Sequence, residues 1–193
     1  MPPVEQASIA AQDEAARVFT QRQFRDAMGQ FATGVVVIST ERDGEAHAMT
    51  ANAFMSGSLQ PPLVMVSVAC SARACERIRA AGTFGVSILA CTQQLVSNHF
   101  AGKPSPDHVP AFERLDGLPV VAGASVQIAA DLRHDYACGD HALFVGEVRA
   151  LRQAPSPARP LLFHGGRYGR MAAPDWSADA LPEGFWANHE YRW

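Results

Sequence analysis

A run of small, hydroxylated and amide residues comes directly before an apolar segment. Residues 50–58 read TANAFMSGS and pass through two prolines into the apolar residues 63–69. Such residues are typical of surface turns. They also allow main-chain N–H groups to approach a flat polar ligand, because small side chains leave the backbone accessible. Two interpretations therefore stay open, an ordinary turn and the wall of a ligand site.

Two later segments combine glycine with polar side chains. In GDH, His141 follows Gly139 and Asp140 at the start of an expected strand. A histidine in such a place is more often a structural hydrogen-bonding group than a base. In HGGRY, residues 164–168, the glycine pair permits close backbone approach, although a hairpin turn explains it equally well.

The signatures of several common enzyme classes are missing. No GxGxxG follows a strand, no GxxxxGK[ST] occurs, and neither Ser87 nor Ser125 stands in a GxSxG elbow. Lys103 is the only lysine and lies in a flexible-looking loop, which argues against Schiff-base chemistry. We therefore expect no catalytic nucleophile.

The cysteines and the bulk composition indicate an ordinary protein of the cytoplasm. The four cysteines have no CxxC spacing and no histidines at metal-site intervals, so we expect reduced thiols and no metal. A net charge of −3 gives no reason to expect nucleic acid or acidic lipid as a partner. The longest apolar run, residues 63–70, is too short to span a membrane, and no secretory signal is recognisable.

Three short helices are expected. Thr20 and Gln23 make a capping box for the first, QRQFRDAMGQF. Its apolar residues recur at i, i+4 and i+7, which predicts a stripe that faces a core; they are Phe24, Met28 and Phe31. Ser71 is expected to cap a second helix that ends at Gly82, and Thr92 to cap a third.

Strands dominate the rest of the chain. Apolar or alternating runs predict strands at residues 33–40, 63–69, 83–90, 126–133, 141–152 and 160–166. Asp43 and Gly44 predict a hairpin turn, whereas residues 102–123, rich in proline and glycine, predict a long irregular loop. Because no regular βαβ alternation is present, the pattern favours a closed antiparallel barrel with accessory helices.

Four segments occur in the order and spacing of one known family. They are FRDAMGQFATGVVVIST, AMTANAFMSGSLQPPLVMVSV, GDHALFVGEV and LLFHGGRYGRM. Together they make the chain similar to the flavin reductase family of split-barrel proteins, the small partners of two-component flavin-dependent monooxygenases. The resemblance covers residues 20–171, with an N-terminal arm over residues 1–19 and an aromatic tail over residues 172–193.

The resemblance implies a fold, a reaction and partners. The fold would be mainly β with accessory helices, an antiparallel, Greek-key-like, FMN-binding split β-barrel that forms a homodimer. The reaction would be hydride transfer from NADH or NADPH to N5 of FMN or FAD, with reduced flavin passing to a separate monooxygenase. Neither a nucleic acid nor a membrane would be a partner.

The resemblance also implies site residues. The expected flavin contacts are Thr33, Met49, Thr50, Ala51, Asn52, Ser56, Ser58, Ser71, Arg73, Phe100, Ala101, His164, Arg167 and Tyr168, and His141 is expected to position the nicotinamide. The hydroxyl and amide groups between Thr50 and Ser58 suit the ring edge and ribityl chain. Ser71 and Arg73 suit the phosphate, because a helix N-terminus favours an anion. Simpler roles stay open, with Ser71 as a cap, Arg73 as a solvated charge and Phe100 as a core residue.

Two alternative functions also remain. A non-catalytic flavin-binding or sensing module on the same barrel would share every flavin contact; an open face for NAD(P)H, together with GDH and HGGRY, favours the enzyme. A pyridoxamine-phosphate-oxidase-like enzyme would need several basic residues for its phosphate, and only Arg73 is well placed.

Overall fold

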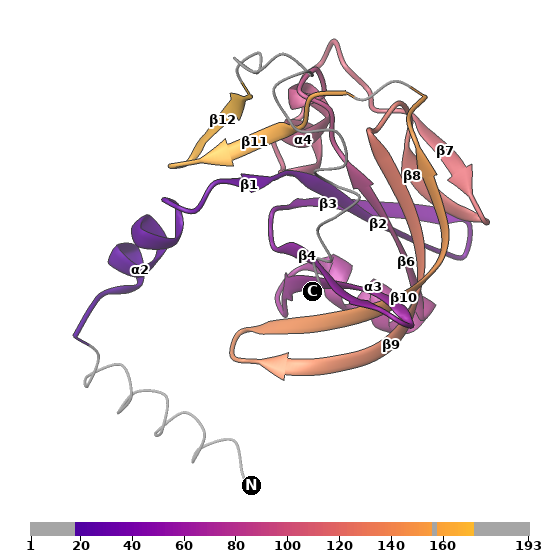
Figure 1. The fold of residues 1–193 in the computed structure, drawn as a ribbon, viewed down its shortest axis with the longest axis horizontal. Helices are drawn as coiled ribbons and strands as arrows, with labels where there is room; N and C mark the ends of the chain where they lie inside the picture. Colours follow the sequence, from indigo (N-terminus) through magenta and orange to yellow (C-terminus); the bar gives the residue numbers. More distant parts are fainter. Residues whose placement is uncertain (1–17, 156–157, 172–193) are drawn as a thin grey trace, which may run out of the picture.

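The computed structural model describes residues 18–155 and 158–171 (Figure 1). Almost all of the predicted arm, and the whole predicted tail with its three tryptophans, lie outside the described residues. Three helices are present within them, α2 (Gln21–Met28), α3 (Arg73–Ala81) and α4 (Gln94–Phe100). None of these helices has the length and apolarity needed to cross a membrane.

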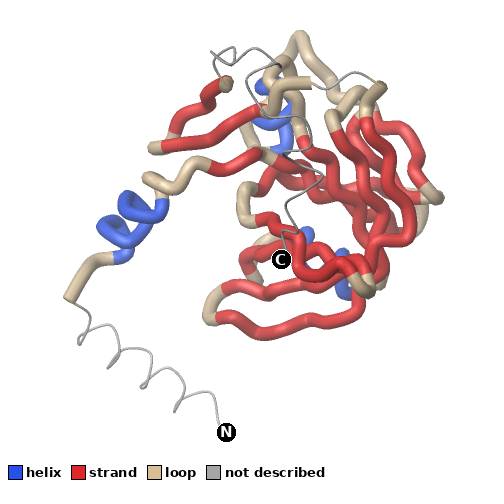
Figure 2. Tube along the Cα trace, in the orientation of Figure 1, coloured by secondary structure: helices blue, strands red, loops and turns tan. Residues whose placement is uncertain are grey.

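Strands make up most of the described chain, which confirms the prediction of a mainly β fold (Figure 2). The strands are β1 (Thr33–Gly34), β2 (Val36–Arg42), β3 (Glu45–Ala51), β4 (Phe54–Leu59), β5 (Pro62–Ala69), β6 (Thr83–Ile88), β7 (Phe112–Leu115), β8 (Leu118–Val121), β9 (Val126–Cys138), β10 (His141–Gln153), β11 (Leu161–His164) and β12 (Arg167–Arg170).

One large antiparallel sheet organises the molecule. Its strand order is β3-β2-β6-β9-β10-β5-β4, while β1-β11-β12 form a small sheet and β7-β8 a hairpin. In the described residues no ladder joins the outer strands β3 and β4 to each other. They are nevertheless consecutive in the chain, and only Asn52 and Ala53 separate them.

The strand β2 separates two apolar clusters. Side chains alternate along a strand, so Val36 and Ile38 face one cluster and Val37 faces the other. The first cluster contains the fully buried rings of Phe84 and Phe144, and α3 covers it with three buried residues. The second lies under α4 and the small sheet.

Several local predictions are confirmed. Thr20 and Gln23 form the predicted capping box at the start of α2. Gly82 ends α3 in the left-handed conformation, with φ of 66°. Asp43 and Gly44 have φ of 53° and 79°, and positive values at both central residues are what a tight β-hairpin turn between β2 and β3 requires.

The two predicted caps at Ser71 and Thr92 are wrong. The N-cap positions of α3 and α4 belong instead to Ala72 and Gln93, and neither makes a side-chain cap hydrogen bond. The N–H groups of Ala72 and Gln93 each donate, at 2.9 Å, to the carbonyl three residues earlier. A tight turn therefore precedes each helix and takes up the residue that was expected to cap it.

Two predicted loops contain regular structure. Within residues 102–123, β7 and β8 form a hairpin around Asp116 and Gly117, whose φ values are 48° and 82°. The segment of residues 50–58 is the end of β3 and most of β4, with a bulge between Ser56 and Ser58. The prediction of irregular structure fails in both segments because each pairs with a neighbouring strand across a short turn, as in the ladders of β3 with β2, of β4 with β5 and of β7 with β8.

The apolar stripe of α2 does not face a core, contrary to prediction. Phe24, Met28 and Phe31 are 54%, 56% and 75% exposed, and α2 buries no residue. The helix stands away from the large sheet (Figure 1) and is fastened at its C-terminal end, where Gly165 N donates to Gly29 O at 2.8 Å. Periodicity identified the apolar face correctly but did not determine what covers it.

Candidate functional site

Asn52 and Ala53 form the connection between the two outer strands of the large sheet. The N–H of Phe54 donates to Asn52 O at 3.0 Å, and the N–H of Ser67 donates to Ala53 O at 3.1 Å. These bonds turn the chain sharply from β3 into β4. The Asn52 side chain stays exposed, with both a donor and an acceptor available.

The GDH turn lies beside this connection. His141 begins β10 and pairs with Ala69 of β5. Its Nδ1 lies 2.7 Å from Asp140 Oδ1, and this hydrogen bond holds the pKa of the Asp140 carboxyl below its ordinary value. A carboxylate only accepts hydrogen bonds, so Nδ1 carries the proton and Nε2 is left free for another partner.

Asn52 and His141 line one open cavity of about 1100 Å³. The cavity is lined by Phe19, Gln21, Phe24, Arg25, Met28, Asn52, Ala53, Gly139, Asp140 and His141. Its polar wall comes from the sheet, and its largely apolar wall comes from α2 and the residues just before it. A flat molecule with a polar edge and apolar faces matches these two walls.

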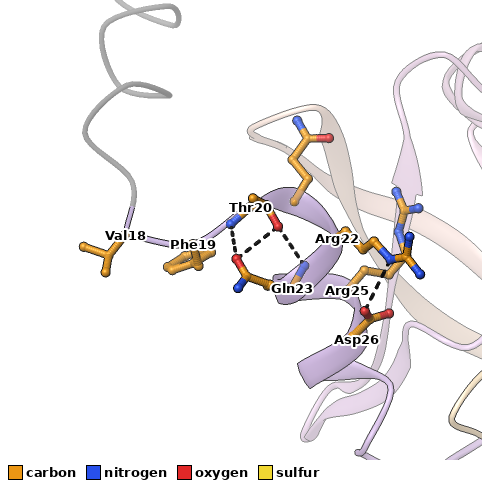
Figure 3. A pocket seen from close by; sticks show the side chains of 8 residues that line it. Val18, Phe19, Thr20, Arg22, Gln23, Arg25 and Asp26 are labelled. Carbon is orange, nitrogen blue, oxygen red and sulfur yellow. Dashed lines mark hydrogen bonds and ion pairs between the residues drawn. The ribbon is translucent and has the colours of Figure 1, made fainter.

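The apolar wall depends on the first turn of α2. Figure 3 shows Thr20 and Gln23 bonded to each other there, and Arg22 directed at Asp26, with 3.8 Å between nitrogen and oxygen. The capping box satisfies N–H groups at the helix start, which stabilises a helix that packs on little else. The ring of Phe19, the residue before this box, stacks on the ring of Phe24, with 5.9 Å between centroids.

A second group of predicted residues meets between β3, α4 and β12. Thr50 Oγ1 donates to Ser97 O at 2.7 Å, and Ser97 Oγ lies 2.8 Å from the Tyr168 hydroxyl. The Tyr168 ring packs edge-on against Phe163, with 5.5 Å between centroids. Because Thr50 is two residues from Asn52, roughly 7 Å along a strand, this group adjoins the cavity.

Thr33 of β1 has an unsatisfied hydroxyl. It pairs with Phe163, and its Oγ1 is buried without a hydrogen-bond partner among the described residues. A buried hydroxyl without a partner is costly. The Thr33 hydroxyl therefore remains able to form a hydrogen bond with a ligand.

Strand alternation divides the predicted residues of β3. Met49 and Ala51 pack against the first apolar cluster, on the opposite side of the strand from Thr50. Only their main-chain groups could contact a ligand next to Thr50. Phe100 is half-buried and packs against Phe112 at 5.5 Å, and Ala101 is the C-cap of α4, so neither lines the cavity.

Ser56 and Ser58 lie away from the cavity. Ser58 pairs with Leu63 at one end of β5, whereas His141 pairs with Ala69 at the other end, about 20 Å away at the usual rise per residue. Ser58 Oγ accepts from Gln60 N at 3.2 Å and so stabilises the β4–β5 turn. The structure does not bring these serines together with Asn52.

Ser71 lies two residues before α3, and Arg73 is the first residue of that helix. The residue before Ser71 donates its N–H to Asp140 O at 2.9 Å, which places Ser71 close to the edge of the cavity. Arg73 is exposed, has no ion-pair partner in the described part of the chain, and opens into a separate hollow of about 410 Å³. That hollow is lined by Arg42, Asp43, Glu45, Arg73, Glu76 and Arg77.

Two arginines of α3 lower the pKa of a histidine in β3. Burial, then the charge of Arg77 and then that of Arg73, lower the pKa of His47 from its ordinary value of 6.5. Arg77 itself donates to Glu45 at 3.1 Å. The charges of Arg77 and Arg73 therefore add to burial in disfavouring the protonated form of His47.

The HGGRY segment forms a hairpin turn, which was the simpler of its two interpretations. His164 and Arg167 face each other across the β11–β12 hairpin and are exposed. Gly165 and Gly166, with φ of 55° and 76°, make the turn. Through the bond to Gly29 this hairpin holds the end of α2, but neither His164 nor Arg167 lines the cavity.

Three residues of the candidate site were not predicted from the sequence. Ser97 connects Thr50 to Tyr168, and no motif marks it. Phe24 and Met28 form a wall of the cavity, although their spacing had suggested core residues.

Among the residues that the structure describes, no three His, Cys, Asp or Glu side chains gather to hold a metal ion.

Comparison with known proteins gives consistent matches. Residues 28–172 match the family model described as the flavin reductase like domain. An NADH-dependent flavin reductase from a Rhodococcus species is 42% identical over 153 residues, which cover 77% of this chain and 85% of that protein. An NADH-dependent FAD reductase from Streptomyces globisporus is 39% identical over 160 residues, covering 79% and 86%.

A solved structure agrees with these matches. The flavin reductase of a styrene monooxygenase from Pseudomonas putida superposes with a TM-score of 0.71 at 39% identity. The superposition covers 78% of this chain and 99% of that one.

Proposed function

The chain belongs to the family of flavin reductase like domains, and from that premise we propose that it reduces FAD or FMN with NADH and releases the reduced flavin to a separate monooxygenase. The observation that carries the proposal is the cavity in which Asn52 and His141 face the apolar side of α2. Its volume of about 1100 Å³ is slightly larger than the usual range of about 300–1,000 Å³ for small-molecule sites, which suits two ligands.

The task of the protein is to hold two flat rings face to face without intervening water. A bound flavin supplies N5 as hydride acceptor, and NADH supplies the hydride from C4 of its nicotinamide, so no acid–base residue is needed. Phe24 and Met28 offer apolar surface to a ring face. Asn52 and the main chain around it offer donors and acceptors to a ring edge.

We assign the nicotinamide to His141. Its protonated Nδ1 is held by Asp140, so Nε2 can accept a hydrogen bond from the carboxamide of NADH. The imidazole would orient the ring and would not transfer a proton. Asp140 is a positioning residue, because it acts through His141.

The described residues fit a flavin. The unsatisfied Oγ1 of Thr33 and the exposed amide of Asn52 can bond to it, and the exposed guanidinium of Arg73, with Ser71 beside the cavity, can meet its phosphate. The other flavin contacts remain predictions; they are Met49, Thr50, Ala51, Ser56, Ser58, Phe100, Ala101, His164, Arg167 and Tyr168.

We propose that the large sheet curls into the split β-barrel of the family, Greek-key-like in its connections. The support is the short connection between its outer strands: β3 ends at Ala51 and β4 begins at Phe54. Two residues span a few ångströms, so the two outer strands must come close at that end. This closure places Asn52 at the junction of the two edges.

We propose that the chain forms a homodimer in which a second copy covers Phe31, just beyond the end of α2. The support is the exposure of Phe31, which is 75% exposed and does not line the cavity, since exposed apolar surface is characteristic of interfaces. Light scattering at micromolar concentration should show a dimer, and Phe31→Asp, which leaves the cavity lining intact, should shift it toward monomer. An active monomeric wild type would contradict the proposal.

Two further assignments accompany the reaction. Residues 20–171 would form the reductase domain, with the flanking segments outside it. A location in the cytoplasm is supported by the four cysteines, all of them free. We expect no nucleic acid or membrane partner.

The function is tested by measuring NADH consumption with and without added flavin. Consumption should require FMN, FAD or riboflavin, and should be slower with NADPH. The competing function is a non-catalytic flavin-binding module. Tight flavin binding without turnover by either nicotinamide would establish that alternative.

A further inference from the structure

Two cysteines flank the turn between β5 and α3. Cys70 is exposed, whereas Cys75 is only 1% exposed. Cys75 N donates to Ala72 O at 3.0 Å, and Ala72 N donates to Ala69 O at 2.9 Å, so the chain folds tightly back between the two cysteines. The Cys70 thiol is close enough to Cys75 to contribute to the raised pKa of the Cys75 thiol, after the larger effect of burial. An accessible thiol and a buried one thus lie on either side of one hydrogen-bonded turn.

The surroundings give the two thiols different roles. Arg79 lies one helical turn after Cys75 and is paired with Asp135 at 2.6 Å; its positive charge lowers the pKa of the Cys75 thiol, an effect that Asp135 partly opposes. Positive charge stabilises the negative charge that develops on an attacked or attacking sulfur. Burial raises the pKa of Cys75, so it keeps its proton near neutral pH. Cys70 is therefore the thiol that an oxidant meets first.

We propose that Cys70 and Cys75 form a reversible disulfide when the protein meets hydrogen peroxide, and that the disulfide weakens flavin binding. The Cys70 sulfur attacks peroxide and the O–O bond breaks, giving the sulfenic acid and one water. The Cys75 sulfur then attacks the Cys70 sulfur and the S–O bond breaks. The Cys75 proton leaves with the hydroxyl as a second water. Two thiols lose two electrons, and peroxide gains them.

The oxidant follows from the reaction itself. Reduced flavin that meets dioxygen before it reaches an oxygenase is reoxidised, and the dioxygen becomes hydrogen peroxide. Bond formation would draw Cys70 toward the buried Cys75 and so reshape the turn that carries Ser71 and Arg73. Flavin binding would then fall when reduced flavin is made faster than it is used. This consequence rests on the proposed function, whereas the disulfide does not.

Peptide mapping of the full chain tests the disulfide. The protein is treated with equimolar hydrogen peroxide, alkylated under denaturing conditions and digested with trypsin. Cleavage after Arg73 and Arg77 leaves Cys75 in the peptide of residues 74–77, apart from the peptide that contains Cys70. We expect these two peptides to be joined, to separate on reduction, and to weigh two hydrogen atoms less than the sum of the free thiols.

Variants identify the pair. Cys91→Ser and Cys138→Ser, as matched controls, should keep the link, and Cys70→Ser should abolish it. Cys75→Ala should leave Cys70 as a sulfenic acid that dimedone traps. Oxidised Cys70 with Cys75 still alkylated, or a link from Cys70 to Cys138, would overturn the proposed pair.

Flavin affinity tests the consequence. In the oxidised protein the Kd for FMN should rise about tenfold, the loss of one hydrogen bond to a charged group, and reduction should restore it. Cys70→Ser should bind FMN equally before and after peroxide. Linked peptides with an unchanged Kd would overturn the regulatory effect. Failure of the proposed reductase function can be told apart from failure of the disulfide proposal. If the protein is not a reductase, the untreated protein will not oxidise NADH, but the linked peptides will still form.

Discussion

The Nδ1 atom of His141 lies 2.7 Å from Oδ1 of Asp140, its neighbour in the turn before β10. The carboxylate accepts this hydrogen bond and thereby sets the tautomer and orientation of the ring. Both residues line the cavity that Asn52 shares, so an effect on the imidazole should reach the ligand beside it.

Removal of the Asp140 carboxylate should impair nicotinamide binding selectively. In Asp140→Ala the KM for NADH should rise about fivefold, with kcat changed less than KM, because one orienting hydrogen bond is lost. Asp140→Asn, which keeps an acceptor, should restore most of the loss. Asp107→Ala, an exposed aspartate elsewhere, is the control. An equal loss of flavin affinity in Asp140→Ala would remove the pair from the nicotinamide site.

Removal of the Arg73 guanidinium should distinguish phosphorylated from unphosphorylated flavin. Arg73→Ala should weaken FMN binding by about 1.5–3 kcal/mol, the range for hydrogen bonds to charged groups. Riboflavin has no phosphate, so its affinity should change little. Fluorescence titration of both flavins measures the difference, with Arg170→Ala as an exposed arginine control. Equal losses for the two flavins would show that Arg73 does not meet the phosphate.

Tyr168→Phe should affect stability more than binding. The hydroxyl is 2.8 Å from Ser97 Oγ, and Ser97 is fully buried, so its loss should lower the free energy of unfolding by about 1–2 kcal/mol. Phenylalanine keeps the ring, so any contact of the ring with a flavin should survive. Urea denaturation and flavin titration measure the two effects, with Tyr136→Phe as the exposed control. A large loss of flavin affinity at unchanged stability would assign the hydroxyl to the ligand.

His47 should make stability depend on pH. Its pKa in the folded protein is below 6.5, mainly because of burial and then because of Arg77 and Arg73. The unfolded chain therefore binds a proton first as pH falls, so the stabilisation is complete above about pH 7 and declines through pH 6 toward the folded pKa.

His47→Gln should flatten this decline in urea denaturation, and Arg77→Ala should raise the His47 pKa measured by NMR. His164→Gln, at an exposed histidine, should keep the wild-type decline. An unchanged pH profile in His47→Gln would show that another group is responsible.

Sequence patterns predicted the features of the fold that short segments determine. The capping box of Thr20 and Gln23 and the turn at Asp43 and Gly44 depend only on neighbouring residues, and both are present. The helix cap predicted at Ser71 was wrong. The Ser71 side chain suits a cap, but a turn closed by the preceding strand displaced the helix start by one residue.

The candidate site was less accessible to sequence reasoning, because long-range pairing assembles it. Asn52 and His141 were named separately, yet only the pairing of β5 with β10 and the sharp connection from β3 to β4 bring them to one cavity. Met49 and Thr50 were expected together, but strand alternation directs them to opposite sides. The exposure of Phe24 depends on what packs against α2, which periodicity does not specify.

Hydride transfer is tested most directly by anaerobic stopped-flow mixing of the protein and flavin with NADH. The visible absorbance of FMN or FAD should disappear in a rapid phase, and NADH deuterated at nicotinamide C4 should slow that phase. His141→Ala should slow it or demand more NADH while flavin affinity stays near wild type. Flavin that binds but keeps its absorbance with both NADH and NADPH would contradict the assignment of a reductase.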